Sequence, residues 1–427
     1  MHVSQASRRT SILHITQPVD GGVARVVTDL VRSQLEQGFD VAVACPGGPF
    51  TARLRALGAD VRHWPATRSP LLSALREVSG IARVIDAVRP DLVHMHSAKA
   101  GLAGRLAVRG RIPTVFQPHA WSFEAVGGTT RAVAVQWEKR AARWASALVC
   151  VSEAERVTGA RAGIAGRWRV IPNGIDLERF RPAPGAPGHS TGPAGEPRAA
   201  RTGHSAPAPH ARLPQLAAAD PPAPLVVCVG RLCRQKGQDV LLAAWDAVVQ
   251  RVPDARLVLV GDGPEGARLR RHASKSVLFA GAVADPVPWY RAADVVVLPS
   301  RWEGMALAPL EAMACGRPVV VTDVDGARES LPPALAAHCL IPPGDPAALA
   351  GTVAELLLDR TLRVRLGELG RRHVLSAHDL RRTTEAVVAL YRELLTPRPA
   401  AQRMPGLRAD WPPPGADPTE HRESIHS

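Results

Sequence analysis

Short apolar runs alternate with helical segments along most of this chain, and this rhythm constrains its fold more than any other feature. Segments such as residues 23–37 and 71–88 carry apolar residues at helical spacing, between runs short enough to be buried strands. Alternation of this kind predicts parallel sheets with helices on both faces. It occurs in two series, with runs at 12–15, 41–45, 61–63, 92–94, 114–116 and 148–151, and then at 225–229, 257–260, 277–279, 295–298, 319–322 and 340–341.

The two series predict an α/β protein with two doubly wound, Rossmann-like domains. Residues 182–224 consist largely of Pro, Ala, Gly, Ser and Arg, and this composition cannot bury enough apolar surface to offset its ordering entropy. We therefore expect a first domain at 1–181, a disordered insertion at 182–224 and a second domain at 225–378. A C-terminal helix at 379–396 and a disordered, proline-rich tail at 397–427 would follow.

The chain is strongly basic, with 53 Lys and Arg against 39 Asp and Glu, a formal net charge of +14. A GC-rich genome would produce such an arginine-, alanine- and proline-rich composition, and attraction to anionic partners is the functional explanation. Nothing resembles an aromatic-interleaved nucleic-acid module, so we expect no nucleic-acid partner. A membrane surface or a lipid-phosphate acceptor fits better. Arg105, Arg109 and Arg111, on or after an apolar helix, would face that membrane or simply water.

Targeting signals and cysteine spacing indicate the compartment. The sequence has no run of about eighteen apolar residues that would span a membrane. The first ten residues lack the apolar region of a signal peptide. Six scattered cysteines without zinc or redox spacing predict buried free thiols in a reducing compartment. We expect a cytoplasmic protein that contacts the inner membrane face peripherally.

Two glutamates, Glu303 and Glu311, flank a loop of small residues that leads into a helix. Pro309 has no N–H and a fixed φ, so it suits the first helical turn. Helix N-termini favour phosphate, so the preceding backbone would donate to a diphosphate, with a carboxylate at each end for two hydroxyl-rich sugars. This describes a nucleotide sugar, although two surface carboxylates are the plain alternative. The loop residues expected to bind the donor are Gly304, Met305, Ala306 and Leu307.

Glycines and cations follow the first strand of each series, where ligands bind in open α/β sheets. Gly21 and Gly22 precede a helix expected to begin near residue 23, and would let the backbone approach a phosphate or form a plain tight turn. In the second series Gly230 is followed by Arg231 and Lys236. These cations would stabilise a departing nucleoside diphosphate without a metal ion, unless the loop is merely solvated.

Three histidines fall at strand ends in the first series. His119 follows the fifth run, where a lone histidine is either structural or a candidate for contact with a ligand. His94 and His96 have the spacing of metal ligands, but without a third ligand in view we expect no metal site. His96 is instead a candidate acceptor-side residue.

The two glutamates resemble the paired glutamates of the family 4 retaining glycosyltransferases, which have the GT-B fold. The block from Gly230 to Gly237 closely resembles the Gly-Arg-Leu…Lys-Gly motif of that family. The chain departs from the family in having Met305 and Ala306 where Phe-Gly is common. The resemblance implies two domains facing each other across a cleft, with a C-terminal helix crossing back to the first.

The resemblance also implies a role for each site residue. Glu303 and His119 would orient the hexose, and Glu311 would hold the ribose hydroxyls. Arg231 and Lys236 would hold the diphosphate. Backbone groups around one further residue, Val283, would read the base.

The implied function is retaining transfer of a hexose-type sugar from a nucleoside-diphosphate sugar, by front-face departure and attack. The acceptor would be a polysaccharide, lipid-linked or small molecule, and the role would lie in polysaccharide biosynthesis. No cofactor or metal is expected. The alternatives are a nucleotide-sugar epimerase or phosphorylase of the same fold, and a non-catalytic scaffold in envelope-polymer assembly.

Overall fold

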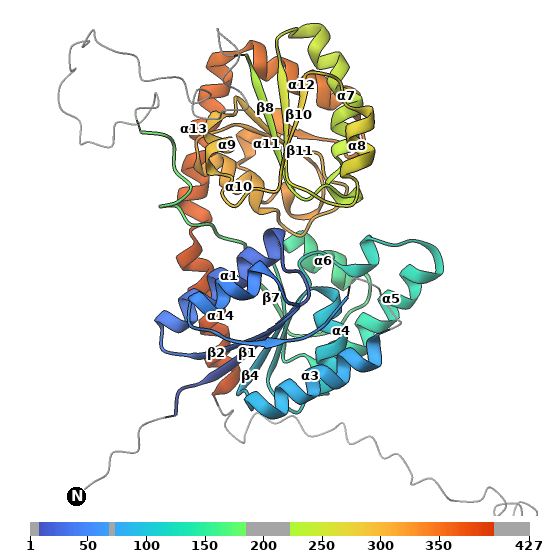
Figure 1. The fold of residues 1–427 in the computed structure, drawn as a ribbon, viewed down its shortest axis with the longest axis vertical. Coiled ribbons are helices and arrows are strands. Elements are labelled where there is room, and N and C mark those ends of the chain that lie inside the picture. Colours follow the sequence, from blue (N-terminus) through green and yellow to red (C-terminus); the bar gives the residue numbers. More distant parts are fainter. Residues whose placement is uncertain (1–7, 68–72, 185–222, 397–427) are drawn as a thin grey trace, which may run out of the picture.

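The computed structural model describes residues 8–67, 73–184 and 223–396, and it contains two separate parallel sheets (Figure 1). The first has seven strands in the order β3-β2-β1-β4-β5-β6-β7, and the second has six in the order β10-β9-β8-β11-β12-β13. In both sheets the order reverses beside the first strand of the series, which is the doubly wound arrangement. The predicted pair of Rossmann-like domains is therefore confirmed. Residues 185–222 of the predicted insertion and the whole predicted tail lie outside the described residues.

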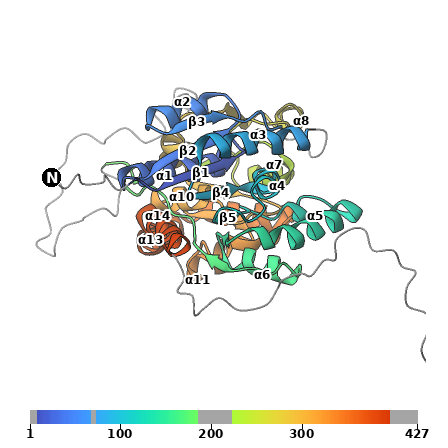
Figure 2. The same ribbon diagram turned by 90° about the horizontal axis from the view of Figure 1, so that it is seen from below.

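The central strands of the first sheet are buried and mostly apolar, because helices cover both faces of the sheet (Figure 2). Sequence reasoning missed β7, which has three residues, all only half-buried. The strands are β1 (Ser11–Thr16), β2 (Asp40–Cys45), β3 (Asp60–His63), β4 (Leu92–His96), β5 (Thr114–Gln117), β6 (Ala147–Cys150) and β7 (Trp168–Val170). The helices are α1 (Gly21–Glu36), α2 (Pro49–Ala56), α3 (Ala74–Val88), α4 (Ser97–Val108), α5 (Gly128–Ala141) and α6 (Glu153–Arg161).

The second sheet is as apolar as the first, and its predicted strands lie within one or two residues of the observed ones. Its strands are β8 (Leu225–Val229), β9 (Arg256–Val260), β10 (Val277–Gly281), β11 (Val295–Leu298), β12 (Val319–Thr322) and β13 (Leu340–Ile341). Its helices are α7 (Gln238–Arg251), α8 (Gly266–His272), α9 (Val287–Ala292), α10 (Leu307–Ala314), α11 (Pro333–Cys339), α12 (Pro346–Leu358) and α13 (Arg360–Ala377).

The C-terminal helix α14 (Leu380–Leu395) lies against the first domain, beside α1 in both views (Figures 1 and 2). The chain enters it through a bridge to the end of that domain, where Leu380 N donates to Ile175 O at 3.1 Å. Tyr391 of α14 is fully buried, with its hydroxyl 2.5 Å from Nδ1 of His94 in β4. The helix therefore supplies part of the first domain's core.

Direct contacts join the two domains near the carboxyl ends of their strands. Ser152 Oγ donates to Gly304 O at 3.2 Å, and Asn173 Nδ2 donates to Met305 O at 2.8 Å. The carboxylate of Glu329 accepts from two N–H groups in the first turn of α6, each at 2.7 Å, which places a negative charge at the positive end of that helix. The strand ends of both domains thus border one shared site.

The membrane-facing role predicted for Arg105 is wrong. Its side chain is fully buried, because α4 packs its small residues against the sheet. The guanidinium lies 2.8 Å from Glu138 and stacks over the Phe116 ring at 3.9 Å. Arg109 and Arg111 are exposed past the end of α4. In the described part of the chain no helix is both long and apolar enough to cross a membrane. All six cysteines are buried and unpaired, as predicted.

Candidate active site

The cations and carboxylates of the second domain form a connected group. Lys236, at the end of a 3-10 turn, places Nζ 2.5 Å from Oε1 of Glu303. Ser300 Oγ donates to the same oxygen at 2.7 Å. The loop after β8 therefore lies directly against the loop after β11, as the sequence predicted from position alone.

Gly237 makes this close approach possible. Its φ is +66°, and a Cβ there would lie 1.9 Å from the carbonyl oxygen of Pro299. Only glycine fits a left-handed position with a backbone oxygen at that distance. The following helix α7 begins at Gln238, whose side chain donates to the Arg231 carbonyl at 3.0 Å. Among the described residues the Arg231 guanidinium has no hydrogen bond or ion pair, so it is available to a ligand.

Two helix N-termini meet in the cleft. The helix α1 begins at Gly21 rather than near residue 23, so Gly21 and Gly22 form its first turn. A Cβ on Gly22 would lie 3.8 Å from Leu307, the first residue of α10. Each N-terminus presents unpaired backbone N–H groups and the positive end of a helix dipole. Their meeting point suits a multiply charged anion.

The residues of the loop between Glu303 and α10 are packed into the protein rather than facing water. Met305 and Leu307 are 5% and 7% exposed, and Ala306 has the extended backbone of a helix N-cap. Gly304 lies so close to the first domain that a Cβ would be 3.1 Å from Ala120 N. Pro309 is the third residue of α10, as the sequence predicted.

Glu311 lies on α10 one turn after Leu307 and is only 5% exposed. Its Oε2 accepts from the Tyr290 hydroxyl at 2.7 Å, and its Oε1 is 3.6 Å from Arg25 Nε. Burial raises the pKa of the Glu311 carboxyl, and Arg25 and Tyr290 act in the opposite direction. Sequence reasoning missed both partners. Arg25 had a local signal, because it lies one helical turn after the paired glycines.

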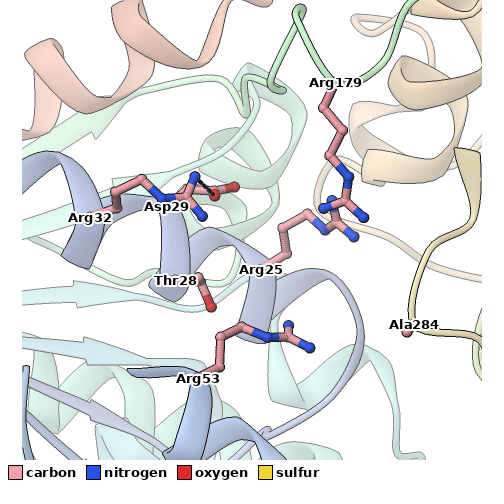
Figure 3. A pocket seen from close by; sticks show the side chains of 7 residues that line it. All are labelled: Arg25, Thr28, Asp29, Arg32, Arg53, Arg179 and Ala284. Atoms are coloured by element: carbon pink, nitrogen blue, oxygen red, sulfur yellow. Dashed lines mark hydrogen bonds and ion pairs between the residues drawn. The ribbon is translucent and has the colours of Figure 1, made fainter. Parts of the chain in front are cut away.

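A cavity of about 290 Å³ lies between the domains, and Arg25, the partner of Glu311, is part of its lining (Figure 3). Arg25, Arg53 and Arg179 point into the same space, while Arg32 pairs with Asp29 at 3.4 Å. The cavity is lined by Arg25, Thr28, Asp29, Arg32, Arg53, Arg179 and Ala284. Burial raises the pKa of Asp29 to about 6. Ala284 follows Val283 directly, so the predicted base-reading segment borders this arginine pocket, which the sequence did not reveal.

His119 is held at the cleft by a strained turn. His119 and Ala120 have φ of 57° and 100°, in the left-handed region. The buried carboxylate of Glu155 fixes this turn, because it accepts from Ala120 N at 2.6 Å and from Val151 N at 2.7 Å. Burial raises the pKa of Glu155 to about 7 and lowers that of His119 to about 3. The imidazole of His119 is therefore neutral at pH 7.

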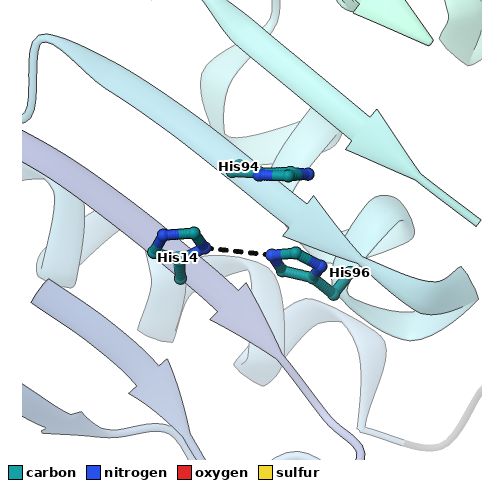
Figure 4. Close-up of side chains that lie close together, drawn as sticks. All are labelled: His14, His94 and His96. Atoms are coloured by element: carbon teal, nitrogen blue, oxygen red, sulfur yellow. Dashed lines mark hydrogen bonds between the residues drawn. The ribbon is translucent and has the colours of Figure 1, made fainter. Parts of the chain in front are cut away.

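Behind His119, three histidines are fully buried in the first sheet: His14 of β1 and His94 and His96 of β4 (Figure 4). His96 touches His119 and not the cleft, so its predicted role on the acceptor side is wrong. His14 supplies the third histidine that sequence reasoning missed, and one nitrogen of each ring lies within 4.8 Å of the others. The rings of His94 and His96 are tilted by 33° with their centroids 4.0 Å apart, and His14 Nδ1 lies 3.0 Å from His96 Nε2.

The comparisons with known proteins agree with this geometry. Residues 20–179 match the family model described as Glycosyltransferase Family 4, and residues 223–359 match Glycosyl transferases group 1. D-inositol 3-phosphate glycosyltransferase from Saccharomonospora viridis is 31% identical over 91% of this chain and 94% of its own. The UDP-Gal:alpha-D-GlcNAc-diphosphoundecaprenol alpha-1,3-galactosyltransferase of Escherichia coli is 27% identical over 74% of this chain and 80% of its own.

Solved structures show the same fold. HepE from Anabaena, in complex with UDP and glucose, matches with a TM-score of 0.71 and 23% identity over 90% of this chain and all of its own. Sucrose-phosphate synthase from Thermosynechococcus elongatus matches with a TM-score of 0.72 and 23% identity, over 90% of this chain and 99% of its own. The chain thus belongs to glycosyltransferase family 4 and is a GT-B glycosyltransferase that uses nucleotide sugars.

Proposed function

We propose that the protein is a retaining enzyme that moves a hexose-type sugar to a polysaccharide, lipid-linked or small-molecule acceptor. The observation that carries this proposal is the meeting of the N-termini of α1 and α10 at Gly22 and Leu307, with Glu303 in the loop before α10 and Glu311 on α10 itself. Backbone donors in the middle match a diphosphate, and a carboxylate at each end matches the hydroxyls of hexose and ribose.

The leaving diphosphate gains negative charge as the sugar departs. Lys236 is already held in place by Glu303. The guanidinium of Arg231, which has no partner within the described part of the chain, lies on the same loop. Fixed cations and helix N-termini stabilise this charge without reorganising during the reaction. In this proposal they do so without a metal ion.

Retention of configuration comes to this proposal from the resemblance to the retaining family 4 enzymes, and the carboxylates bear on how it would be reached. A double displacement needs a carboxylate nucleophile next to the anomeric carbon. The Oε1 of Glu303 already accepts from Lys236 and Ser300, which suits a group that orients sugar hydroxyls rather than one that attacks carbon. A retaining reaction without such a nucleophile requires departure and attack on the same face of the sugar.

The acceptor in this proposal carries phosphate. Three relatives have names that specify such acceptors: a diphosphoundecaprenol, an inositol 3-phosphate and a phosphatidylinositol monomannoside. The net charge of +14 and the arginine pocket would attract an anionic acceptor and an anionic membrane surface. Sedimentation with anionic vesicles at low salt, and release at high salt, is the expected result.

The test is product analysis with a nucleotide sugar and a phosphate-bearing acceptor. We expect a glycoside with the anomeric configuration of the donor, determined by NMR. A product of inverted configuration would overturn the retaining mechanism. Conversion of the nucleotide sugar without any acceptor would favour the epimerase, and binding without turnover in any acceptor pool would favour the scaffold.

A further inference from the structure

A continuous hydrogen-bonded chain runs from the cleft into the core of the first domain. His119 Nε2 lies 3.1 Å from His96 Nδ1, and His96 Nε2 lies 3.0 Å from His14 Nδ1. His14 Nε2 lies 2.8 Å from Oε1 of Gln34, a fully buried residue of α1. Beyond it, Gln34 Nε2 donates to the Tyr391 hydroxyl at 3.4 Å, which is 2.5 Å from His94 Nδ1.

The chemistry of Gln34 gives this chain a direction. An amide oxygen only accepts, so His14 must carry its proton on Nε2. Burial lowers the pKa of His14 to about 4, so the ring is neutral and its Nδ1 accepts. His96, also neutral because burial lowers its pKa, must then donate from Nε2 and accept at Nδ1. His119 in turn donates from Nε2 to His96.

The free nitrogen of His119 is therefore a hydrogen-bond acceptor. Its Nδ1 has no partner among the described residues and is not one of the buried unpaired atoms, so solvent or a ligand reaches it. A neutral imidazole that donates from Nε2 has a lone pair on Nδ1. A sugar hydroxyl can donate to that lone pair, whereas a carboxylate at the same point meets only repulsion.

We propose that Gln34, acting through His14 and His96, is a positioning residue that fixes the tautomer of His119 so that Nδ1 accepts from a hydroxyl of the donor sugar. The specificity that follows is for a neutral hexose over a uronic acid whose carboxylate would face His119. The contact between His119 and the donor sugar rests on the proposed function. The tautomer of His119 is a property of the enzyme without ligand and does not depend on that function.

The tautomer is measured directly by long-range ¹H–¹⁵N NMR of histidine in the full-length enzyme at pH 7. We expect His119 as the Nε2–H form in the wild type, a measurement that needs no variant. A wild-type His119 found as the Nδ1–H form would overturn the proposal. Gln34→Met keeps the side-chain length but removes the acceptor, and we expect mixed His119 tautomers and a loss of about tenfold in kcat/KM for the donor.

Two further variants separate positioning from packing. Gln34→Glu restores an acceptor at His14 and should return His119 to the Nε2–H form. Tyr391→Phe removes the weaker 3.4 Å partner of Gln34 and the hydroxyl beside His94. Neither contact lies on the path from Gln34 to His119, so the His119 tautomer should stay unchanged. If Gln34→Met leaves both the spectrum and kcat/KM as in the wild type, the positioning role is wrong. If the tautomers behave as expected but no nucleotide sugar is turned over, only the proposed function fails.

Discussion

The two sides of the cleft hold their polar groups by different means. On the second domain, the candidate residues lie within two short stretches, 230–237 and 300–311, and hold one another through the Lys236–Glu303 pair. On the first domain, His119 depends on Glu155, His96, His14 and, through them, Gln34. One side is built from local motifs and the other from residues that only the fold brings together. Substitutions should therefore act on chemistry on one side and on preorganisation and stability on the other.

The largest expected effect on the second-domain side comes from Lys236→Ala. Removing a fixed cation from the leaving diphosphate should lower kcat by about 10²- to 10³-fold, the range seen for loss of one transition-state donor. Steady-state kinetics with a saturating donor would measure this. A kcat equal to that of the wild type would remove Lys236 from the mechanism.

Gly237→Ala tests whether the second-domain side also depends on the close approach of the Gly237 backbone to the carbonyl oxygen of Pro299. The new Cβ would lie 1.9 Å from Pro299 O at a φ of +66°, so we expect a loss of about 3 kcal/mol in unfolding free energy. The matched control is Gly21→Ala on the first domain, where φ is +70° but no atom lies within 4 Å. It should cost only about 1 kcal/mol from backbone strain. Equal losses in urea denaturation would show that the close approach to Pro299 is unimportant.

Glu311→Ala should mainly weaken donor binding. Loss of a charged hydrogen-bond acceptor costs about 2 kcal/mol, so the donor Kd should rise roughly thirtyfold with kcat changed much less. Tyr290→Phe, which removes only the partner hydroxyl of Glu311, is the control and should have a smaller effect. Isothermal titration with the nucleotide alone is the measurement. An unchanged Kd would mean that Glu311 does not bind ribose.

The effect expected to be smallest near neutral pH is a pH dependence on the first-domain side. Burial lowers the pKa of His119 to about 3 in the folded state, below the ordinary 6.5. Between these values the unfolded chain binds a proton that the folded protein does not, so acidification costs stability. Relative to His119→Asn, the wild type should lose about 1.4 kcal/mol per pH unit below 6.5. Asn is the control because it tolerates the left-handed backbone at this position. If the free energy of unfolding has the same pH slope in both proteins, the pKa of His119 is not lowered.

The same contrast explains what the sequence could predict. The fold was predictable because strands buried on both faces are continuous apolar runs. The pairing of Lys236 with Glu303 was predictable because each residue follows a strand at the same edge of the second sheet. His14 and Gln34 lie on separate elements and gave no local signal. Arg53 of α2 and Arg179 of the segment after β7 line the same cavity only because the fold brings these two segments together. Arg105 was misassigned because its charge suggested exposure, whereas Glu138 and Phe116 surround it in the core.

The most direct test of the donor site is thermal unfolding of the wild type with UDP, GDP, ADP and their common sugar conjugates. One nucleotide should stabilise the protein selectively, by about 2.7 kcal/mol at a hundredfold excess over its Kd, and Glu311→Ala should weaken that stabilisation. Failure of every nucleotide to shift the transition would contradict a donor site between α1 and α10.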